Sequence, residues 1–520
     1  MEPTAQQTSF QGLLDGGPFA YGVELVTTRG VPALEDGAQV VRLGEALADE
    51  PRIGWLSVTD NPGGNPMLPP DWLARMLTSR RVEIVIHMTC KDLNRNGLES
   101  AAWRYAADGF NNILALTGDY PGGGYGGRAG AVFDLDSVSL TALLAAMNDG
   151  LEVTTPKGTT DHLEPTDFYV GCAVTPFKRH ERELMPQLFK LARKIHCGAE
   201  WVITQLGYDM RKFHEVKLFM QWAQVDAPLI GNVYLLNRPV ARLFHQNKVP
   251  GCVVTDRLLE QTEKYAAGPD KGRAFFRELA AKQLAVFKGL GFQAGYLGGV
   301  HKAETVSEII DMAEAFGADD WKEFAKEIQY SKDDEFYLFE QDPVTGLGDV
   351  EVLNPEYEQS LQGAGRDGGK SLGYRITRAV HDRVFTPGKG AFPWLQGLYR
   401  RLEDKDDHLA LKALHRIEQV SKGMAFGCQD CGDCSLPETG YLCPRVACSK
   451  TGRNGPCGGS SDGLCERQDK ECLWARAYER LKAYGENADM LKGPAVFYNS
   501  DLERTSSWAN LYGGRDHHAD

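Results

Sequence analysis

Eight short apolar runs divide roughly the first three hundred residues of this chain, and a turn and then usually a helical pattern follow each one. Their near-continuous apolar character is typical of parallel strands that are covered on both faces. The runs are YGVELV, IGWLSVTD, VEIVIHMT, NILALTGD, FYVGCAVT, WVITQL, PLIGNVYLL and AGYLGGV. In the helical stretch 98–109, the spacing predicts that Ala101, Trp103 and Ala106 face inward.

Eight strand-then-helix units in this length predict a (β/α)8 TIM barrel. A doubly wound sheet is the alternative, but it needs fewer strands and usually has a GxGxxG fingerprint after the first strand. The first run here leads into TTRGVP, which does not match that fingerprint. We therefore expect an α/β protein whose barrel occupies residues 1–318.

Polar residues stand at the ends of several of these apolar runs. They are Glu24, Thr59, His87, Thr117, Asp119 and Gln205. In a barrel of this type, the chemistry takes place at the carboxyl ends of the strands. Any one of these residues alone is more simply a satisfied polar group at a strand end, whereas six on one rim indicate a site.

The composition changes after the last strand-and-helix unit. Residues 319–375 are rich in charge and glycine, which predicts a connecting region with little core of its own. Helical patterns then return, and we expect residues 376–520 to form a smaller, cysteine-rich domain of helices and loops that binds metal. His517 and His518 stand in a polar end of the chain, where we expect a disordered tail rather than a metal site.

The start of the chain and its charge bear on location and partners. The sequence MEPTAQQTSFQGLLDGG has no basic segment followed by an apolar run, and no apolar stretch reaches membrane-spanning length. These features predict a cytoplasmic protein in a reducing environment. The net charge is −14 and basic residues are scattered among acidic ones, which argues against a nucleic-acid partner.

Eight of the twelve cysteines fall in one segment of the second domain. They are Cys428, Cys431, Cys434, Cys443, Cys448, Cys457, Cys465 and Cys472. In a reducing compartment, clustered cysteines are more often metal ligands than disulfides. The CxxCxxC start, with a proline after Cys443, favours two [4Fe–4S] clusters. One or two structural zinc sites are the alternative, and a mixed or partly filled site stays open. We expect the remaining cysteines, Cys90, Cys172, Cys197 and Cys252, to be small core residues.

Five motifs of the first domain resemble the methylenetetrahydrofolate reductase family, whose members are flavin-bearing (β/α)8 barrels. GVELVTTRG stands where that family has its first strand, WLSVTDNPGG resembles its VTYGAGG turn, and IVIHMTC resembles its PHLTC strand. NILALTGDYP is similar to its NILALRGDP motif, and WVITQL is similar to its AITQ strand.

The second domain, from about Ile376, resembles the cysteine-rich domain that is fused to or partnered with this reductase in some bacteria, including acetogens. Its most specific stretches are CGDCSLPETGYLCP and RNGPCGG. In that partner the cysteines are thought to carry iron–sulfur clusters. The resemblance covers both ends of the chain and leaves the middle linker unmatched.

The resemblance implies a reaction and a role for each matching residue. Glu24 matches the general acid that protonates N10 of 5,10-methylenetetrahydrofolate, so that the ring opens to an iminium. Reduced flavin then delivers hydride from its N5 atom, which gives 5-methyltetrahydrofolate. Asp119 matches the second catalytic residue, a carboxylate near flavin and pterin, and Gln205 matches a folate contact. The implied flavin contacts are Thr59, His87, Thr117, Gly118, Asp119, Arg193 and Lys194.

Three positions depart from the family pattern. Thr117 stands where arginine is usual, the tyrosine expected near the dinucleotide falls near Val174, and Pro239 lies near the aromatic residue that stacks on folate or nicotinamide. FAD and FMN therefore both stay open, as does the loss of direct NADH binding. A chain that carries both domains suggests electrons from a redox protein, such as ferredoxin or another flavoprotein, relayed through the clusters.

We therefore expect an oxidoreductase that interconverts methylenetetrahydrofolate and methyltetrahydrofolate, in a direction that the sequence leaves open. One alternative is the same reaction driven directly by NAD(P)H, with a structural zinc domain. A second is a non-catalytic electron-transfer or scaffold subunit, and a third is a corrinoid- or pterin-dependent methyltransferase. No nucleic-acid or membrane partner is expected, and a homo-oligomer stays open.

Overall fold

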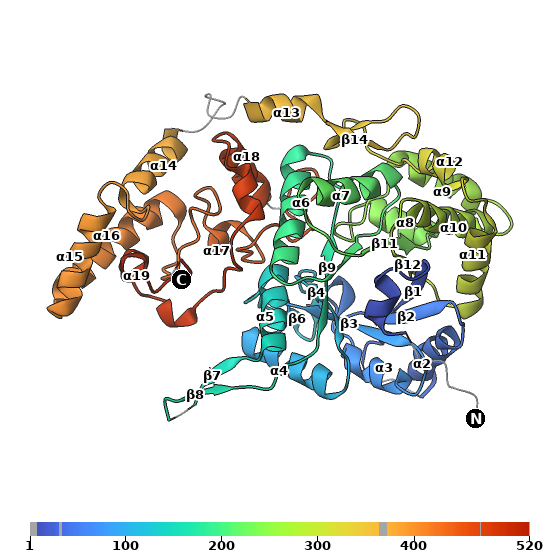
Figure 1. The fold of residues 1–520 in the computed structure, drawn as a ribbon, viewed down its shortest axis with the longest axis horizontal. Helices are drawn as coiled ribbons and strands as arrows, with labels where there is room; N and C mark the ends of the chain where they lie inside the picture. The colour runs from blue at the N-terminus through green and yellow to red at the C-terminus, as the bar shows by residue number, and fades with distance from the viewer. Residues whose placement is uncertain (1–7, 31–33, 156, 363–371, 468–469, 519–520) are drawn as a thin grey trace.

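The barrel is closed. The computed structural model describes residues 8–30, 34–155, 157–362, 372–467 and 470–518. Within them, parallel strands pair in the order β1-β12-β11-β10-β9-β4-β3-β2 (Figure 1). They are β1 (Ala20–Leu25), β2 (Ile53–Val58), β3 (Glu83–Thr89), β4 (Asn112–Leu116), β9 (Tyr169–Val174), β10 (Trp201–Thr204), β11 (Leu229–Tyr234) and β12 (Ala294–Gly298). Each predicted apolar run is one of these strands, so the (β/α)8 prediction is confirmed and the doubly wound alternative is wrong.

Helices cover the outside of the barrel. They are α2 (Leu34–Ala48), α3 (Pro70–Leu77), α4 (Arg95–Ala107), α5 (Ser137–Asp149), α6 (Glu181–His196), α7 (Met210–Trp222), α8 (Arg238–His245), α9 (Asp256–Ala266), α10 (Arg273–Gly289) and α11 (Ala303–Ala315). Two hairpins interrupt the alternation: β5 (Gly123–Gly124) with β6 (Gly127–Arg128), and β7 (Glu152–Thr154) with β8 (Thr160–His162). A short helix, α1 (Phe10–Leu14), buries Phe10 among the inward-facing side chains at the start of the barrel.

Two tryptophans fill the barrel interior, each against a glycine of the neighbouring strand. Trp55 on β2 lies opposite Gly22 on β1, and Trp201 on β10 lies opposite Gly171 on β9. A Cβ atom at either glycine would stand 2.0 Å from the facing indole. The interior is therefore a packed core, as is usual for this fold, and only its carboxyl end is left for polar chemistry.

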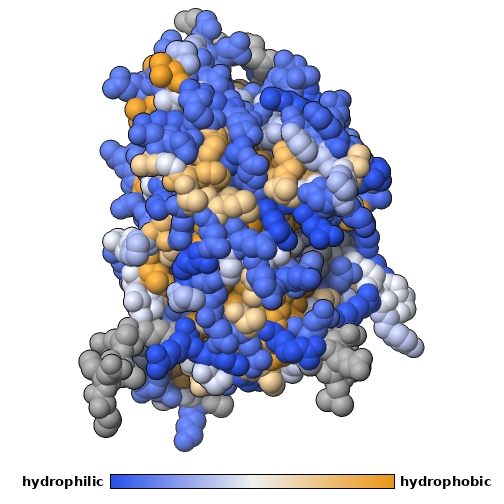
Figure 2. All heavy atoms as spheres, turned by 90° about the vertical axis from the view of Figure 1, so that its right-hand side faces the viewer, coloured by the Kyte–Doolittle hydropathy of each residue, from blue (hydrophilic) through white to orange (hydrophobic). Residues whose placement is uncertain are grey.

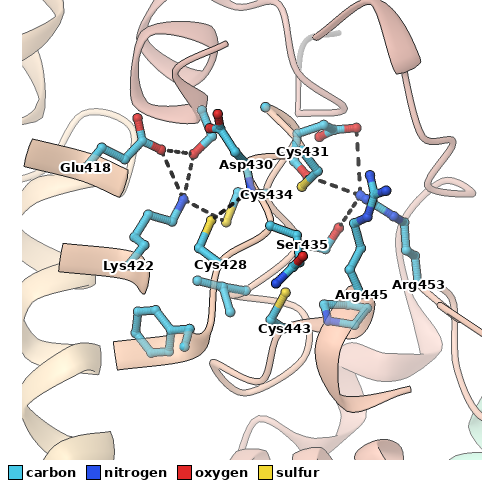
Figure 3. A pocket seen from close by; sticks show the side chains of 17 residues that line it. Glu418, Lys422, Cys428, Asp430, Cys431, Cys434, Ser435, Cys443, Arg445 and Arg453 are labelled. Atoms are coloured by element: carbon cyan, nitrogen blue, oxygen red, sulfur yellow. Dashed lines mark hydrogen bonds and ion pairs between the residues drawn. The ribbon is translucent and has the colours of Figure 1, made fainter. Parts of the chain in front are cut away.

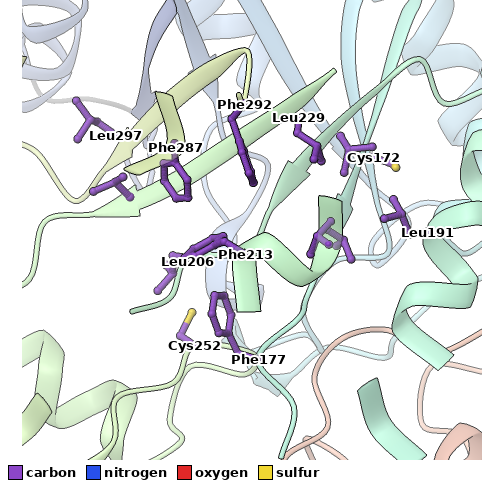
Figure 4. Close-up of a cluster of buried hydrophobic side chains, with 14 of the residues drawn as sticks. Cys172, Phe177, Leu191, Leu206, Phe213, Leu229, Cys252, Phe287, Phe292 and Leu297 are labelled. Carbon is purple, nitrogen blue, oxygen red and sulfur yellow. The ribbon is translucent and has the colours of Figure 1, made fainter. Parts of the chain in front are cut away.

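A second core layer lies between the strands and the outer helices (Figure 4). The ring of Phe213 on α7 contacts Phe177 at a centroid distance of 5.0 Å and Phe287 at 4.7 Å. Cys90, Cys172 and Cys252 are buried and Cys197 is half-buried. Among the described residues these four lie in or beside the barrel core, as predicted.

The predicted inward orientation of Trp103 is wrong. Helix α4 buries Leu98, Ala101, Ala102 and Tyr105, which recur every three to four residues on one face. Trp103 stands two positions beyond Ala101, off that face, and is 39% exposed. The register of the buried stripe decides this orientation, and the hydrophobicity of the indole does not.

The segment after α11 packs against the barrel. It forms α12 (Trp321–Glu327), the antiparallel pair β13 (Phe339–Gln341) and β14 (Gly348–Leu353), and α13 (Pro355–Gln362). Leu338, Phe339 and Leu347 are buried in the main core, and the amide of Phe339 donates to Glu215 of α7 at 3.1 Å. The expected linker thus contributes side chains to the barrel core; residues 363–371 of that linker lie outside the described residues.

The C-terminal part lies beside α6 and α5 (Figure 1). Its helices are α14 (Leu372–Val384), α15 (Phe392–Asp404), α16 (His408–Phe426), α17 (Pro444–Ala447), α18 (Leu473–Lys482) and α19 (Ser507–Gly513). Tyr478 on α18 donates to Glu181 of α6 at 2.6 Å, and its ring contacts Phe189. Long loops between α16 and α18 carry all eight clustered cysteines.

The surface on the side of α11 and α12 is mostly hydrophilic, with small hydrophobic patches between charged residues (Figure 2). Isolated apolar side chains of this kind are normal on protein surfaces. Among the described residues, no helix has both the length and the apolar character needed to cross a bilayer.

Candidate active site at the carboxyl end of the barrel

Glu24 lies on β1 and faces the interior of the barrel, above the packed tryptophan layer. The carboxyl keeps some solvent contact, yet the surrounding protein raises its pKa to about 7 by burial. The hydroxyl of Tyr296, on neighbouring β12, faces the carboxyl and opposes this rise. A carboxyl with this pKa holds its proton near neutral pH and can give it up, which is what a general acid requires.

Beside Glu24, a hydrogen bond of 2.7 Å joins Ser57 Oγ on β2 to His87 Nε2 on β3. Burial lowers the pKa of His87 to about 4, and Lys91 adds to the decrease. His87 is therefore neutral at pH 7 and can act as a donor or an acceptor, but it carries no charge. Thr59, directly after β2, is buried and its amide donates to Leu25 at 3.1 Å.

The residues after β4 form a tight turn at the same end of the barrel. Thr117 accepts a hydrogen bond of 3.1 Å from the amide of Ser137 at the start of α5. Gly118 has φ +84°, and a Cβ atom there would stand 2.9 Å from Thr89. Asp119 accepts from the amide of Gly63 at 2.8 Å, which fixes its carboxylate toward the loop after β2.

Gln205, after β10, lies on the far side of the same opening. Its Oε1 accepts from the amide of Leu206 at 2.9 Å. A Cβ atom at Gly251 would lie 3.5 Å from Gln205 Nε2 and 3.3 Å from the carbonyl oxygen of Gly458. Gln205 therefore sits where the barrel opening meets the cysteine-bearing loops.

Arg193 and Lys194 are not brought to this opening. They lie in the last turn of α6, and a helix that follows a barrel strand runs back toward the amino ends of the strands. Arg193 donates to the carbonyl of Pro494, and Lys194 donates to that of Ala173 at 2.7 Å. Burial lowers the pKa of Lys194 to about 8. Backbone carbonyls thus hold both side chains in this structure.

The sequence patterns did not single out several polar residues of this site. Lys91, almost fully buried, donates to the carbonyl of Asp60 at 2.9 Å and to Thr89 Oγ1 at 2.7 Å. Asp60 in turn accepts from Thr89 Oγ1 at 2.5 Å. Asp60 and Lys91 each stand at or just beyond the end of a predicted strand, so their position in the sequence could have identified them as site residues. Tyr296 lies inside an apolar run, so the sequence pattern does not distinguish it from a core residue.

The cysteines gather into two sets of four. The first set, Cys428, Cys431, Cys434 and Cys443, surrounds a cavity of about 30 Å³ (Figure 3). Burial raises the pKa values of Cys428 and Cys443, and the sulfurs of Cys431 and Cys434 add to the rise. Lys422 of α16 donates to Cys434 Sγ at 3.2 Å, and the amide of Asp430 donates to Cys428 Sγ at 3.4 Å.

The second set consists of Cys448, Cys457, Cys465 and Cys472. Burial raises the pKa of Cys448 to about 11 and that of Cys472 to about 12, and the sulfur of Cys457 adds to both. The amide of Gly459 donates to Cys457 Sγ at 3.5 Å. Each set thus offers four sulfurs, as a tetrahedral zinc ion or a [4Fe–4S] cluster requires.

The second set lies against the carboxyl end of the barrel. Lys178, just after β9, is fully buried and donates to the carbonyls of Gly458 (2.6 Å) and Ser460. The amide of Asn454 donates to Asp136, the N-cap of α5, at 3.0 Å. Gly458 and Ser460 belong to the loop that directly follows Cys457. The structure therefore places these four sulfurs beside the opening that holds Gln205.

One buried polar group beside the carboxyl end of the barrel lacks a partner that a polar ligand such as a flavin could supply. The buried hydroxyl of Thr28, on the loop after β1, has no hydrogen-bond partner within the described part of the chain. Buried polar atoms without partners are costly, so hydroxyls at an opening commonly await a ligand or water. Gly118 is needed for the turn itself, because a Cβ atom there would collide with Thr89 and its φ is +84°.

Two family models match this chain. The one described as "Methylenetetrahydrofolate reductase" matches residues 32–314, and the one described as "Methylene-tetrahydrofolate reductase C terminal" matches residues 410–497. A curated relative named 5,10-methylenetetrahydrofolate reductase, from Salmonella typhimurium (strain LT2), is 26% identical over 153 residues. That match covers 29% of this chain and 44% of the relative, so it spans less than half of the relative's length.

Two solved structures align with this chain at low similarity. An uncharacterized protein from Clostridium thermocellum, described as binding two copies of 5-methyl-5,6,7,8-tetrahydrofolic acid, aligns with 58% of this chain and 96% of its own, at a TM-score of 0.42 and 11% identity. A putative deoxyribose-phosphate aldolase from Toxoplasma gondii ME49 aligns with 59% and 94%, at 0.30 and 11%. Likeness at this level carries no argument about function.

Proposed function

Because this chain belongs to the methylenetetrahydrofolate reductase family, we propose that it interconverts 5,10-methylenetetrahydrofolate and 5-methyltetrahydrofolate. The observation that carries the proposal is Glu24, a carboxyl with a pKa of about 7 at the carboxyl end of the barrel. In the reducing direction, the proton of Glu24 passes to the folate nitrogen N10. That transfer breaks the ring C–N bond and leaves an iminium carbon that accepts hydride.

The other residues of the opening hold the reactants and the charge. Tyr296, whose hydroxyl faces Glu24, stabilises the carboxylate that remains after proton transfer. Asp119 and Gln205 would bind the polar edge of the pterin. Thr59, His87, Thr117 and Gly118 would line a flavin, which supplies hydride when it is bound and reduced. Arg193 and Lys194 leave this set because they lie at the opposite end of α6.

For the cysteine domain, we propose two four-thiolate centres, each holding a [4Fe–4S] cluster. Bound clusters would supply one-electron exchange with a redox protein such as ferredoxin or another flavoprotein. The position of Gly458 beside Gln205 supports the second set as the one nearer the barrel. Lys422 supports the first set, because its ammonium hydrogen-bonds to Cys434 Sγ and stabilises negative sulfur.

Structural zinc, with NAD(P)H as the direct reductant of the same barrel, is the second candidate. The feature in its favour is the ligand count, because four free cysteines in each set satisfy a tetrahedral zinc ion. Among the described residues, however, no three of these sulfurs lie within 4.8 Å of one another, so a single ion would require them to move closer together. The net charge of the filled site is the same for both, so charge does not decide between them.

The test is to purify the protein without oxygen and measure iron, acid-labile sulfide, zinc and flavin in one sample. About eight iron and eight sulfide per chain support two clusters. The same sample is then assayed for methylenetetrahydrofolate reduction with NADH and with a reduced low-potential carrier. Zinc without sulfide, and turnover with NADH, would establish the second candidate. A protein that binds flavin yet turns over folate with neither reductant would be a scaffold subunit, and the proposal would be wrong.

A further inference from the structure

The last described residues of the chain are packed, contrary to the disordered tail expected from the sequence. The side chain of His517 is only 8% exposed and that of His518 is 34% exposed. Their rings lie beside each other at a centroid distance of 3.9 Å. Both face Glu438, which lies between Cys434 and Cys443 of the first cysteine set in the sequence. These residues pack because the carboxylates of Asp433, Glu438 and Asp516 bind the two imidazoles.

Each imidazole is held through its Nδ1 atom by a different carboxylate. His517 Nδ1 donates to Asp433, and His518 Nδ1 lies 3.2 Å from Asp516 Oδ2. This arrangement fixes both rings in one tautomer and aims both Nε2 atoms toward Glu438. Carboxylates hold metal-bound histidines in the same way, because they orient the ring and raise the basicity of the other nitrogen.

The Nε2 atoms of the two histidines and the carboxylate of Glu438 lie close together. His518 Nε2 lies 2.7 Å from Glu438 Oε1, and His517 Nε2 lies 3.7 Å from the same atom. The three ligand atoms are all within 4.8 Å of one another. His517 Nε2 and Glu438 Oε2 are buried and have no hydrogen-bond partner in the described part of the chain. A zinc ion with ligands at about 2.1 Å needs them about 3.4 Å apart, so small side-chain movements suffice.

We propose that Glu438, His517 and His518 bind one divalent cation of the zinc class, separate from the cysteine centres. Two imidazole nitrogens and one carboxylate oxygen suit zinc and similar borderline ions, and disfavour calcium and magnesium, which prefer oxygen ligands. Three protein ligands leave a fourth position for water or for the second oxygen of Glu438. The +2 ion would offset most of the charge of the carboxylates of Glu438, Asp433 and Asp516, which otherwise face two neutral imidazoles.

The site would tie the end of the chain to the loop of the first cysteine set. Asp433 stands between Cys431 and Cys434 in that loop, so the carboxylate that orients His517 is carried by the segment that carries two of the thiolates. Loss of the cation would free His517 from its bound geometry and remove one restraint on the loop. The proposal concerns this site alone and does not depend on the reductase reaction.

The competing description is an ion-pair cluster in which protons, and no metal, occupy both Nε2 atoms. The full-length protein, free of any affinity tag, is treated with chelator and titrated with Zn²⁺ against a competing dye. His518→Gln is compared with His162→Gln, which removes an exposed histidine on β8. We expect His518→Gln to bind one zinc fewer per chain than both the wild type and His162→Gln. Asp516→Asn is expected to weaken that zinc by about 10–100-fold.

Equal zinc uptake by His518→Gln and the wild type would overturn the proposal. A second measurement covers the case in which the variant fails to fold. Co²⁺ added to the chelated wild type gives intense near-ultraviolet absorption when thiolates bind it, and weak visible bands alone when nitrogen and oxygen do. One Co²⁺ per chain bound without the thiolate signal supports the site. Uptake that is fully accounted for by thiolate-bound Co²⁺ contradicts it.

Discussion

The ammonium of Lys450 donates a hydrogen bond of 2.8 Å to the carbonyl oxygen of Gly118. Lys450 lies between Cys448 and Cys457, and Gly118 precedes Asp119 at the opening of the barrel. The same ammonium forms an ion pair of 2.8 Å with Glu466, and the two side chains are only 4% and 3% exposed. One buried cation therefore connects the second cysteine set to the turn that carries a proposed catalytic carboxylate.

Replacing Lys450 with Met should destabilise the protein strongly. The change leaves the carboxylate of Glu466 buried without its cation, and breaking a buried pair in this way costs about 3–5 kcal/mol. The double variant Lys450→Met with Glu466→Gln removes the unpaired charge and should recover more than half of the lost stability. Chemical unfolding of the three proteins measures this. A double variant as unstable as the single one would mean that the hydrogen bond to Gly118 dominates.

Glu24→Gln should abolish folate reduction while the flavin site stays intact. Gln cannot donate a proton to N10, and loss of a general acid typically costs about 100- to 10,000-fold in rate. Flavin content and flavin reduction by a chemical reductant should be unchanged. Glu152→Gln, an exposed carboxyl on β7, is the matched control and should keep wild-type turnover. If Glu24→Gln reduced folate at the control rate, Glu24 would not be the acid.

The pH dependence of turnover should follow Glu24. Reduction needs the protonated carboxyl, so its rate should be highest below pH 7 and should fall as pH rises through the pKa of about 7. Oxidation of methyltetrahydrofolate needs the carboxylate, so its rate should rise as pH increases through the same pKa. Tyr296→Phe removes a hydroxyl that favours the carboxylate, so the pKa should rise and the reduction profile should move to higher pH. A profile that did not move would show that this hydroxyl does not act on Glu24.

The same carboxyl should lower the stability of the folded protein at alkaline pH. Its pKa is about 7 when folded and near 4.5 when unfolded, so stability is fully present below pH 4.5 and is lost as pH rises to 7. The difference amounts to about 3 kcal/mol as an upper bound. Glu24→Gln should therefore unfold at higher denaturant than the wild type at pH 8, with little difference at pH 4.5. An equal shift at both pH values would exclude this charge as the cause.

The sequence was most informative where one physical rule dominated. Parallel strands covered on both faces leave continuous apolar runs, and all eight barrel strands could be located from them. Glu24 could be found in the same way, because an acid inside such a run has few structural uses. Trp103 and Arg193 show the limit of local patterns, since their environments depend on helix register and on the direction in which α6 runs.

The contacts between the two domains could not be predicted in this way. Lys450 and Gly118 are separated by 332 positions in the chain. The order of eight cysteines in a sequence does not say which four share a centre, because loops decide which sulfurs meet. The terminal histidines illustrate the same point, since a polar end with two imidazoles is read as disorder until Asp433 and Glu438 are seen beside it.

Substitution of one cysteine from each set should separate the two centres. Cys431→Ser removes a ligand of the first set, and Cys457→Ser removes one of the second, which lies beside the barrel opening. If each set holds its own [4Fe–4S] cluster, each variant should lose about four of eight iron atoms, and the double variant should lose nearly all. Because the second set adjoins Gln205, Cys457→Ser should also slow reduction of the flavin by a protein donor, while a small chemical reductant should still reduce the flavin directly. Loss of all eight iron atoms from either single variant would mean that the eight thiolates share the centres differently, and the division into two sets would be wrong.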